Sequence, residues 1–420
     1  MTTADDSSPA LARRLGTVDA VVIGLGSMIG AGVFAAFAPA AAAAGSGLLI
    51  GLAIAAMVAY CNATSSAQLA AQYPTSGGTY VYGREQLGPW WGFLAGWGFL
   101  IGKTASCAAM ALTFAAYAGP PQWERPIAVA AVILLAAVNY RGVTRTAGLT
   151  RVIVAVVLLA LSVVVAAAIF GQKAAFAPAP VLDGGYSWHG VLQSAGLLFF
   201  AFAGYARIAT MGEEVKDPIR TIPRAIQVAL ALTVAIYAVI AITVLRVLGP
   251  DDLARSTSPL ADAVRTSAWT WAEPVVRIGA AAAALGALLA LIAGVGRTGL
   301  AMAREGDLPH WLAAVHPRFR VPHHAEIALA VVVCLLVLTI DLRGAIGFSS
   351  FGVLLYYLVA NLSAYRQDSD HRRFPRLLQV VGVAGCALLV VTLPGTSIWS
   401  GLTLFAVGVA YRVGRLRARE

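Results

Sequence analysis

The chain contains a series of long apolar runs, and these constrain its fold more than any other feature of the sequence. A helix needs about 20 mainly apolar residues to cross the hydrocarbon core of a bilayer. Of the 420 residues, 59% are hydrophobic and only 12% are charged, against roughly 25% charged residues in a soluble domain. We therefore predict an all-α polytopic membrane protein with 12 transmembrane helices rather than a soluble fold. The predicted spans are 17–43, 46–70, 89–117, 124–140, 148–170, 188–212, 224–248, 273–302, 324–341, 343–366, 374–393 and 396–414.

Basic residues are distributed unevenly over the loops between these runs. An even number of spans places both chain ends on one side of the membrane, together with every second loop. The opposite loops hold few basic residues, namely Arg125, Lys173, Arg255, Arg265 and Arg343. Cytoplasmic loops carry the excess of Lys and Arg, so we predict a multi-pass protein of the cell (plasma) inner membrane with both termini cytoplasmic. The net charge of +10 is then a determinant of topology and does not indicate a nucleic-acid partner.

The order of the runs divides the chain into four predicted parts. They are a disordered cytoplasmic N-terminus at 1–16, a ten-helix core at 17–366, helices 11 and 12 at 367–414, and a cytoplasmic tail at 415–420. All cysteines fall inside predicted spans, where isolated cysteines usually pack, and their spacing predicts neither a disulfide nor a metal site. The segment 304–324 is rich in histidine. It is either a solvated loop with pH-sensitive charge or, without convincing ligand spacing, a metal site.

Glycines interrupt the first apolar run. The stretch is GLGSMIGAGVFA (24–35), and each glycine costs about 1 kcal/mol relative to alanine inside a helix. A second glycine-interrupted run follows five spans later, SAGLLFFAFAGYARIATMGEE (194–214). One explanation is that small residues let helices pack closely. Paired interruptions at corresponding places in two halves instead indicate a transporter site, and the presence of the pair favours this second explanation.

Four segments together resemble those of amino acid–polyamine–organocation (APC) transporters. The first is the glycine-rich stretch of span one, which is similar to the signature of that family's broken first helix. The others follow in the family's order and at its spacing; they are YPTSGGTYVYGREQLGPWWGFLAGW (73–97), FFAFAGYARIATMGEEVKDPIRTIPRAI (199–226) and GVGRTGLAMAREGDLP (294–309). The resemblance implies a leucine-transporter-type 5+5 inverted repeat with broken helices 1 and 6, and alternating-access transport of amino acids or related amines.

The resemblance also assigns a substrate site to the two interrupted helices. Backbone N–H groups freed at the first break form the positive end of a half-helix, which suits a carboxylate. At the second break, carbonyls of Phe199, Ala201 and Phe202 would accept the α-ammonium, while Phe200 and Phe202 are aromatic walls or gates, or ordinary core residues. The candidate residues are Gly26, Ser27, Met28, Ile29, Gly30, Ala31 and Gly32 at the first break, and Phe199, Phe200, Ala201, Phe202, Gly204 and Ala206 at the second.

The charges inside the spans bear on the side chain of the substrate. In APC transporters of cationic substrates an acidic residue often occupies the position of Ala206, and no Asp or Glu lies in the central half of any predicted span. A cationic side chain would lack a partner there, which is costly. We therefore predict a secondary active transporter of neutral amino acids, with a cationic amino acid or polyamine transporter or exchanger as the alternative. Import, exchange and export by an amino acid exporter fit the sequence equally.

Two cations lie inside the predicted spans, Lys103 in the middle of span three and Arg207 just past the second break. Intramembrane ionisable residues are functional candidates by default. Desolvation disfavours the charged form of a lysine, so Lys103 is either a proton carrier or a lysine hydrogen-bonded to carbonyls in a wet crevice. Arg207 binds an acidic substrate group or, as we prefer, pairs with Glu213 or Glu214.

The sequence leaves the energy source open. In many sodium-independent APC transporters a lysine of helix five takes the place of a sodium ion, and the matching position here is Val157. The coupling partner is therefore H⁺, Na⁺ or an exchanged substrate. Glu213 or Glu214 with Arg297 is a candidate cytoplasmic gate, and the alternative is a solvated basic rim.

Signatures of other function classes are missing from the sequence. It contains no HExxH, no GxSxG and no acidic pair within a span, so we do not predict an enzyme, a metal or a cofactor. It also contains no P-loop, which leaves ATP-driven pumping without support. A membrane sensor or channel is the remaining alternative to a transporter.

Overall fold

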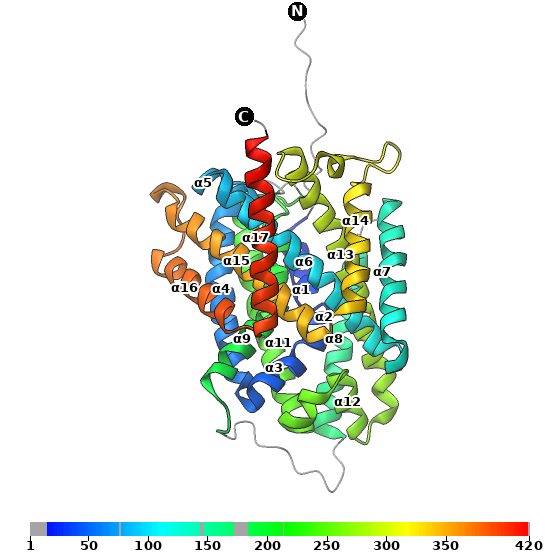
Figure 1. Ribbon diagram of the computed structural model, residues 1–420. Coiled ribbons are helices and arrows are strands. Elements are labelled where there is room, and N and C mark those ends of the chain that lie inside the picture. The colour runs from blue at the N-terminus through cyan, green and yellow to red at the C-terminus, as the bar shows by residue number, and fades with distance from the viewer. Residues whose placement is uncertain (1–14, 75–76, 143–146, 172–183, 213, 419–420) are drawn as a thin grey trace, which may run out of the picture.

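The computed structural model describes residues 15–74, 77–142, 147–171, 184–212 and 214–418. Residues 1–14 of the predicted disordered segment 1–16, and Glu213, lie outside them. In the described part the chain forms helices, which Figure 1 shows packed side by side in one bundle. The α-helices are α1 (Thr17–Met28), α2 (Ala31–Ala35), α3 (Phe37–Ala44), α4 (Leu48–Gln72), α5 (Thr79–Leu87), α6 (Pro89–Ala118), α7 (Glu124–Tyr140), α8 (Ala147–Phe170), α9 (Trp188–Phe202), α10 (Ala206–Ala209), α11 (Pro218–Arg255), α12 (Pro259–Thr266), α13 (Glu273–Arg304), α14 (His323–Thr339), α15 (Leu342–Arg366), α16 (Arg376–Thr392) and α17 (Gly395–Arg417).

Among the described residues, fewer helices meet the criteria for a membrane span than the twelve that were predicted. By length and composition, nine helices of the described chain can cross a membrane, or ten if the bent pair α16 and α17 forms one span. The two helices of that pair meet at 112°. Pro394 lies just before α17. Because proline has no N–H to donate, it cannot continue the hydrogen bonding of the preceding helix, and the pair is interrupted there. The shorter apolar helix α14 lies below the length criterion. The polytopic membrane class is confirmed, while twelve spans in two inverted repeats stay a prediction.

Both ends of the described chain lie at one end of the bundle. The Leu15 N–H donates to the Glu214 carbonyl (3.1 Å) and the Lys216 N–H to the Leu15 carbonyl (2.9 Å). Gly212, in the same segment, packs against Pro74 just before α5. Figure 1 places α5 and the last turn of α17 together at this end and α12 at the other. We call these the termini side and the far side; the assignment of the termini side to the cytoplasm stays a prediction.

Burial separates a central group of helices from a peripheral group. Most residues of α6, α9 and α15 are buried, whereas most residues of α7 and α8 are only partly buried or exposed. The exposed residues of the peripheral helices are large and apolar, for example Leu134 on α7 and Phe170 on α8. Such a surface is compatible with lipid, which is as apolar as these side chains. The two glycine-interrupted runs, α1–α3 and α9–α10, therefore belong to the interior of the bundle, with buried residues along their length.

The histidine-rich segment folds against the start of α14. The ring centroids of His316 and His323 are 5.3 Å apart, and those of His323 and His324 are 4.2 Å apart. The His316 Nδ1 atom accepts hydrogen bonds from the N–H groups of Arg318 and Phe319 (3.2 Å each). Across the described residues, no group of three or more His, Cys, Asp or Glu side chains could hold a metal ion. The imidazoles are thus a compact group facing one another.

We expect the thermal stability of the purified protein to fall as the pH is lowered from about 7.5 to about 5.5. Partial burial lowers the pKa of His323, and charges on His324 and His316 lower it further. The unfolded chain then binds a proton more readily than the folded one, so stability is full above the ordinary pKa of about 6.5 and is lost as the pH falls through the lower folded-state value. Melting curves of His323→Gln should be flatter against pH than those of the wild type. The exposed His371→Gln is the control and should keep the pH dependence of the wild type. If the melting temperature of His323→Gln changed with pH as steeply as that of the wild type, this assignment would be contradicted.

Candidate substrate site at two helix breaks

The first break is short. Helix α1 ends at Met28, Ile29 caps it, and Gly30 leaves the helical region with φ −35° and ψ −142° before α2 begins at Ala31. Within the glycine-interrupted stretch 24–35, the break is therefore confined to Ile29 and Gly30. The carbonyls at the end of α1 and the first N–H groups of α2 have no partner within their own helices. Because α1 ends and α2 begins within three residues, these carbonyls and N–H groups lie close together, and the break offers both hydrogen-bond acceptors and donors.

The second break is a tightening of the helix rather than an unwinding. Helix α9 continues through Phe202, a 3₁₀ turn covers Ala203–Tyr205, and α10 follows from Ala206. A 3₁₀ turn bonds residues three apart instead of four, so it changes the partners of the neighbouring carbonyls. The break was predicted at Phe199, Ala201 and Phe202. This position is corrected, because Phe199 and Ala201 lie inside α9 and the change in geometry begins only at Ala203. The carbonyls of Ala201 and Ala203 border the change in geometry.

Three glycines bring the two breaks into direct contact. A Cβ atom on Gly204 would lie 2.3 Å from the Ser27 carbonyl oxygen. On Gly32 it would lie 2.7 Å from the Ala201 Cβ, and on Gly24 it would lie 2.2 Å from the Cδ1 of Ile208. Real Cβ atoms do not approach other atoms so closely. At Gly204 and Gly32 the neighbouring atoms belong to the backbone or lie next to it, so only glycine fits there. At Gly24 the neighbour is the end of the flexible Ile208 side chain, which can move aside. The sequence offered two explanations for these glycines, close helix packing and helix interruption. In the structure the two interrupted runs are also the ones that pack closely against each other.

Tyr237 of α11 joins the two breaks. Its hydroxyl lies 2.5 Å from the Met28 carbonyl and 3.0 Å from the Ala201 carbonyl. A buried tyrosine usually finds a hydrogen-bond partner, and these carbonyls belong to the end of α1 and to the last turn of α9. The Ala201 carbonyl, predicted to accept the substrate ammonium, therefore already has a donor. Sequence analysis missed Tyr237, although a tyrosine in the middle of the apolar span seven is the signal that points to it.

Lys103 of α6 also reaches the second break. Its ammonium donates to the Ala203 carbonyl (3.4 Å), which also accepts the hydroxyl of Tyr357 of α15 (3.3 Å). Lys103 is buried and takes part in none of the ion pairs found within the described ranges. The geometry agrees with a lysine hydrogen-bonded to a carbonyl. The lysine nitrogen thereby contacts the backbone at Ala203, where the α-helix gives way to the 3₁₀ turn.

The site therefore combines two backbone breaks, two tyrosine hydroxyls and one lysine in the interior of an apolar bundle. A sequence profile described as "Amino acid permease" matches residues 15–411 of the chain. The chain belongs to the amino acid permease family. This confirms the resemblance to the APC superfamily and makes the protein a transmembrane amino acid permease.

Relatives of this permease are named as transporters of different substrates. An uncharacterized transporter of Mycobacterium tuberculosis is 62% identical over 418 residues, which is 99% of this chain and 94% of the relative. The human cationic amino acid transporter 4 is 29% identical over 379 residues, covering 83% of this chain and 58% of its own. The branched-chain amino acid permease of Bacillus subtilis is 24% identical over 404 residues, covering 90% and 86% respectively.

The remaining candidate residues of the permease are mostly buried packing groups. The Ser27 hydroxyl donates back to the Ile23 carbonyl (2.8 Å), and the Phe202 ring lies 5.1 Å from that of Tyr237. Gly30 faces Ala287 of α13. The residues at or beside the two breaks that are buried are Gly26, Met28, Ile29, Gly30, Gly32, Phe199, Phe200, Ala201, Phe202 and Ala206.

The predicted gate residues are arranged differently from the pattern we expected. Arg207 pairs with Glu214 at 3.2 Å, which agrees with the structural pairing preferred for it. Arg297 is exposed, and the structure does not bring it to Glu214. A buried carboxylate that sequence analysis passed over, Glu326 of α14, lies against Gly296 next to Arg297. Its Oε2 atom has no hydrogen-bond partner in the described part of the chain.

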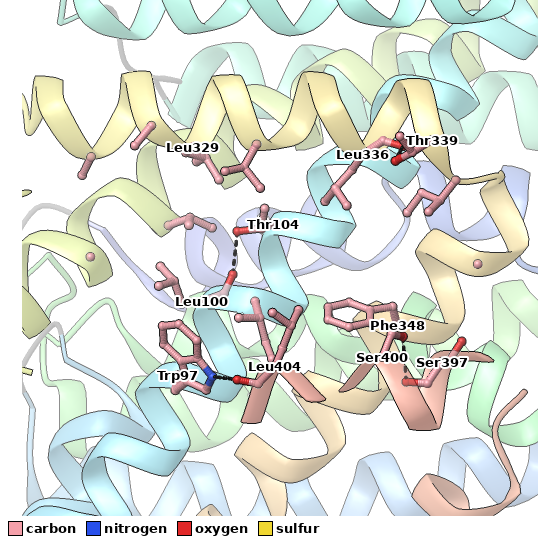
Figure 2. Close-up of a pocket in the computed structure, with 18 of the residues that line it drawn as sticks. Trp97, Leu100, Thr104, Leu329, Leu336, Thr339, Phe348, Ser397, Ser400 and Leu404 are labelled. Carbon is pink, nitrogen blue, oxygen red and sulfur yellow. Dashed lines mark hydrogen bonds between the residues drawn. The ribbon is translucent and has the colours of Figure 1, made fainter. Parts of the chain in front are cut away.

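A large apolar pocket of the permease lies away from the breaks. It has a volume of about 850 Å³ and is lined by α6, α14, α15 and α17 together with α7 and α13. Figure 2 shows Leu329 and Leu336 facing Leu100 and Leu404 across it. None of the candidate substrate residues lines this pocket, so it is not the predicted substrate site.

Proposed function

We propose that this permease is a secondary active transporter that carries neutral amino acids by alternating access, with the substrate bound between the two helix breaks. The observation that carries the proposal is the contact of the breaks at Gly204 and Ser27. The positive end of α2 suits a carboxylate. The carbonyls of Ala201 and Ala203 already accept from Tyr237, Lys103 and Tyr357. The carbonyl of Phe202, the last residue of α9, is therefore the acceptor proposed for the ammonium. A site of this kind recognises the part that all amino acids share.

The electrostatics of the site favour a neutral side chain. The charged group that reaches the second break is Lys103, a cation, while Ala206 offers no carboxylate. A lysine or arginine substrate would bring a second positive charge into a buried region, where like charges repel strongly. Small or branched apolar side chains meet no such cost, and the name of the Bacillus subtilis relative, a branched-chain permease, agrees with this.

The second candidate is transport of cationic amino acids. It is favoured by the names of the human relative and of two Arabidopsis thaliana relatives, cationic amino acid transporters 7 and 6, each 28% identical to this chain. Binding of a cationic side chain would need a carboxylate near the site. The buried Glu326 of α14 lies against Gly296 of α13, nine residues along that helix from Ala287, which faces Gly30. At about 1.5 Å per residue this is roughly 13 Å along the helix, so Glu326 does not supply a carboxylate at the breaks.

The proposal includes the membrane arrangement. We infer twelve spans as a 5+5 inverted repeat followed by two more helices, with both termini in the cytoplasm and the protein in the inner membrane. Coupling to H⁺, Na⁺ or an exchanged amino acid, and the direction of transport, are left open by the site.

We expect proteoliposomes containing the protein and preloaded with unlabelled amino acids to exchange labelled leucine or alanine, and to exchange arginine and putrescine far less. Gly30→Leu should abolish this exchange, because a Cβ on Gly30 already lies 3.0 Å from the Cβ of Ala287. Gly414→Leu is the matched control, since a Cβ there meets nothing within 4 Å. Exchange of arginine or putrescine alone would overturn the neutral assignment. Repeating the assay with proton and sodium gradients identifies the coupling ion.

A further inference from the structure

A second polar site lies on the termini side, where α17 leaves the bundle. It is a small pocket of about 160 Å³ between α5, the segment that follows α13, and the last turns of α17. We call it the arginine pocket. Its lining residues are Arg84, Pro89, Glu305, Gly306, Asp307, Arg412, Arg415 and Leu416.

The charges in the arginine pocket do not cancel. The buried Asp307 carboxylate pairs with Arg412 (2.5 Å) and Arg84 (3.3 Å), and Arg84 also pairs with Glu305 (3.0 Å). Two carboxylates thus face two of the three arginines. Arg415 donates to the Tyr411 hydroxyl (2.9 Å) and to a backbone carbonyl. It takes part in no ion pair of the described residues, which leaves one positive charge uncompensated.

Arg412 is a second cation of the arginine pocket and has a donor atom without an acceptor among the described residues. Arg412 is 7% exposed, and its guanidinium carbon lies 4.8 Å from the ring centroid of Trp90 and 4.7 Å from that of Phe93. Its Nε atom has no hydrogen-bond partner within the described ranges of the chain. A buried donor left without an acceptor costs about 1–3 kcal/mol, and more when it is charged. An acceptor in the pocket would remove that cost.

The large apolar pocket ends at the arginine pocket. Leu308 lines the apolar pocket while its carbonyl accepts a hydrogen bond from Arg415. Trp97, whose indole N–H donates to the Leu404 carbonyl (3.0 Å; Figure 2), stacks on the same Phe93 that contacts Arg412. Leu404 and Arg415 lie on one helix, about 16 Å apart along its axis. That distance is close to one leaflet, which is half of the roughly 30 Å hydrocarbon core.

The apolar pocket adjoins exposed apolar side chains of the bundle. These side chains are large: Leu335 of α14 is 56% exposed and Leu404 of α17 is 38% exposed. Its volume of about 850 Å³ lies in the range of small-molecule sites, roughly 300–1,000 Å³. A groove with an apolar body in the membrane and a cationic end at the membrane boundary matches an amphiphile with one negative charge.

We propose that an anionic phospholipid binds here, with its phosphate in the arginine pocket and an acyl chain in the adjacent half of the apolar pocket. The phosphate oxygens accept from the guanidinium of Arg415, whose charge no carboxylate of the described residues compensates, and Arg412 lines the same pocket. The pocket has one uncompensated positive charge, on Arg415. A headgroup with a net negative charge neutralises it, whereas a zwitterionic headgroup has no net charge and leaves it in place, so an anionic headgroup is selected. Lipid binding would hold α17 against α6 and α14, and it does not depend on which amino acid is transported.

Binding to the delipidated, full-length protein by native mass spectrometry tests the proposal. The probes are dioleoylphosphatidylglycerol, dioleoylphosphatidylcholine and inorganic phosphate. We expect the phosphatidylglycerol to bind more tightly than the other two. Arg415→Gln should weaken its binding about fivefold, as one basic side chain contributes about 1 kcal/mol to an anionic lipid, and Arg415→Lys should retain it. Arg417→Gln, on the same last turn but outside the pocket, is the control for charge.

A second pair of variants tests the acyl chain. Ala328→Trp fills the apolar pocket at a half-buried lining position, whereas Val331→Trp adds the same bulk on the exposed side of α14. We expect the first to reduce phosphatidylglycerol binding and the second to leave it unchanged. Equal binding of the two lipids, or no effect of Arg415→Gln, would overturn the proposal. Binding of inorganic phosphate as tightly as the lipid would also overturn it. Dimers of the wild type that Ala328→Trp breaks would overturn it too, because they would identify a second copy of the chain as the occupant of the pocket.

Discussion

Gly204→Ala should abolish amino acid exchange in proteoliposomes and lower the free energy of unfolding by about 1–3 kcal/mol, the usual cost of overpacking. The added methyl would lie 2.3 Å from the Ser27 carbonyl oxygen and 2.6 Å from the Met28 nitrogen. Both atoms belong to the backbone, which cannot move aside as the end of a flexible side chain can. The two breaks would have to separate, and the site between them would be lost. Exchange per folded protein and thermal melting measure the two effects.

The matched control for this substitution is Gly294→Ala on α13. A Cβ there meets nothing within 4 Å, and alanine is the better helix former by about 1 kcal/mol. Gly294→Ala should therefore exchange amino acids at the wild-type rate and melt at the same temperature or slightly higher. Normal exchange by Gly204→Ala would mean that the breaks do not need their contact for transport, which would remove the main support for the proposed site.

The sequence predicts the two helix interruptions because glycine is costly inside a helix and rarely occurs there without a reason. The run 24–35 contains the break at Ile29–Gly30, and the run 194–214 contains the 3₁₀ turn Ala203–Tyr205. What the sequence leaves undetermined is the form of each break. Whether a helix unwinds or only tightens depends on which neighbours accept and donate hydrogen bonds, and those neighbours lie elsewhere in the chain.

Tyr237 illustrates this limit. It is separated from Met28 by 209 residues and from Ala201 by 36, so no local pattern relates the three. A periodic pattern identifies span seven as a helix but does not reveal which of its residues faces the breaks. The same holds for Arg412 and Asp307, which are 105 residues apart. The positive-inside pattern explains an arginine at the end of α17, but not its burial beside two aromatic rings.

Lys103 differs from these residues because its charge alone identifies it. A lysine in the middle of an apolar span is rare enough to be a functional candidate, and the structure adds its contact with the Ala203 carbonyl. That carbonyl has a second donor in Tyr357. Removal of the lysine therefore leaves the backbone satisfied, so a loss of transport in a lysine variant can be separated from a loss of folding.

We expect Lys103→Met to slow exchange about ten- to hundredfold while the protein remains folded, because a hydrogen bond from a charged group contributes about 1.5–3 kcal/mol. Methionine fills nearly the same volume as the lysine stem, and Lys216→Met, at an exposed position, is the matched control. If Lys103 carries the coupled proton, the exchange rate of the methionine variant no longer depends on pH. Lys103→Arg then also fails, since arginine does not release its proton. Full activity of Lys103→Arg would instead assign a fixed positive charge to this position, and full activity of Lys103→Met would exclude Lys103 from the transport mechanism.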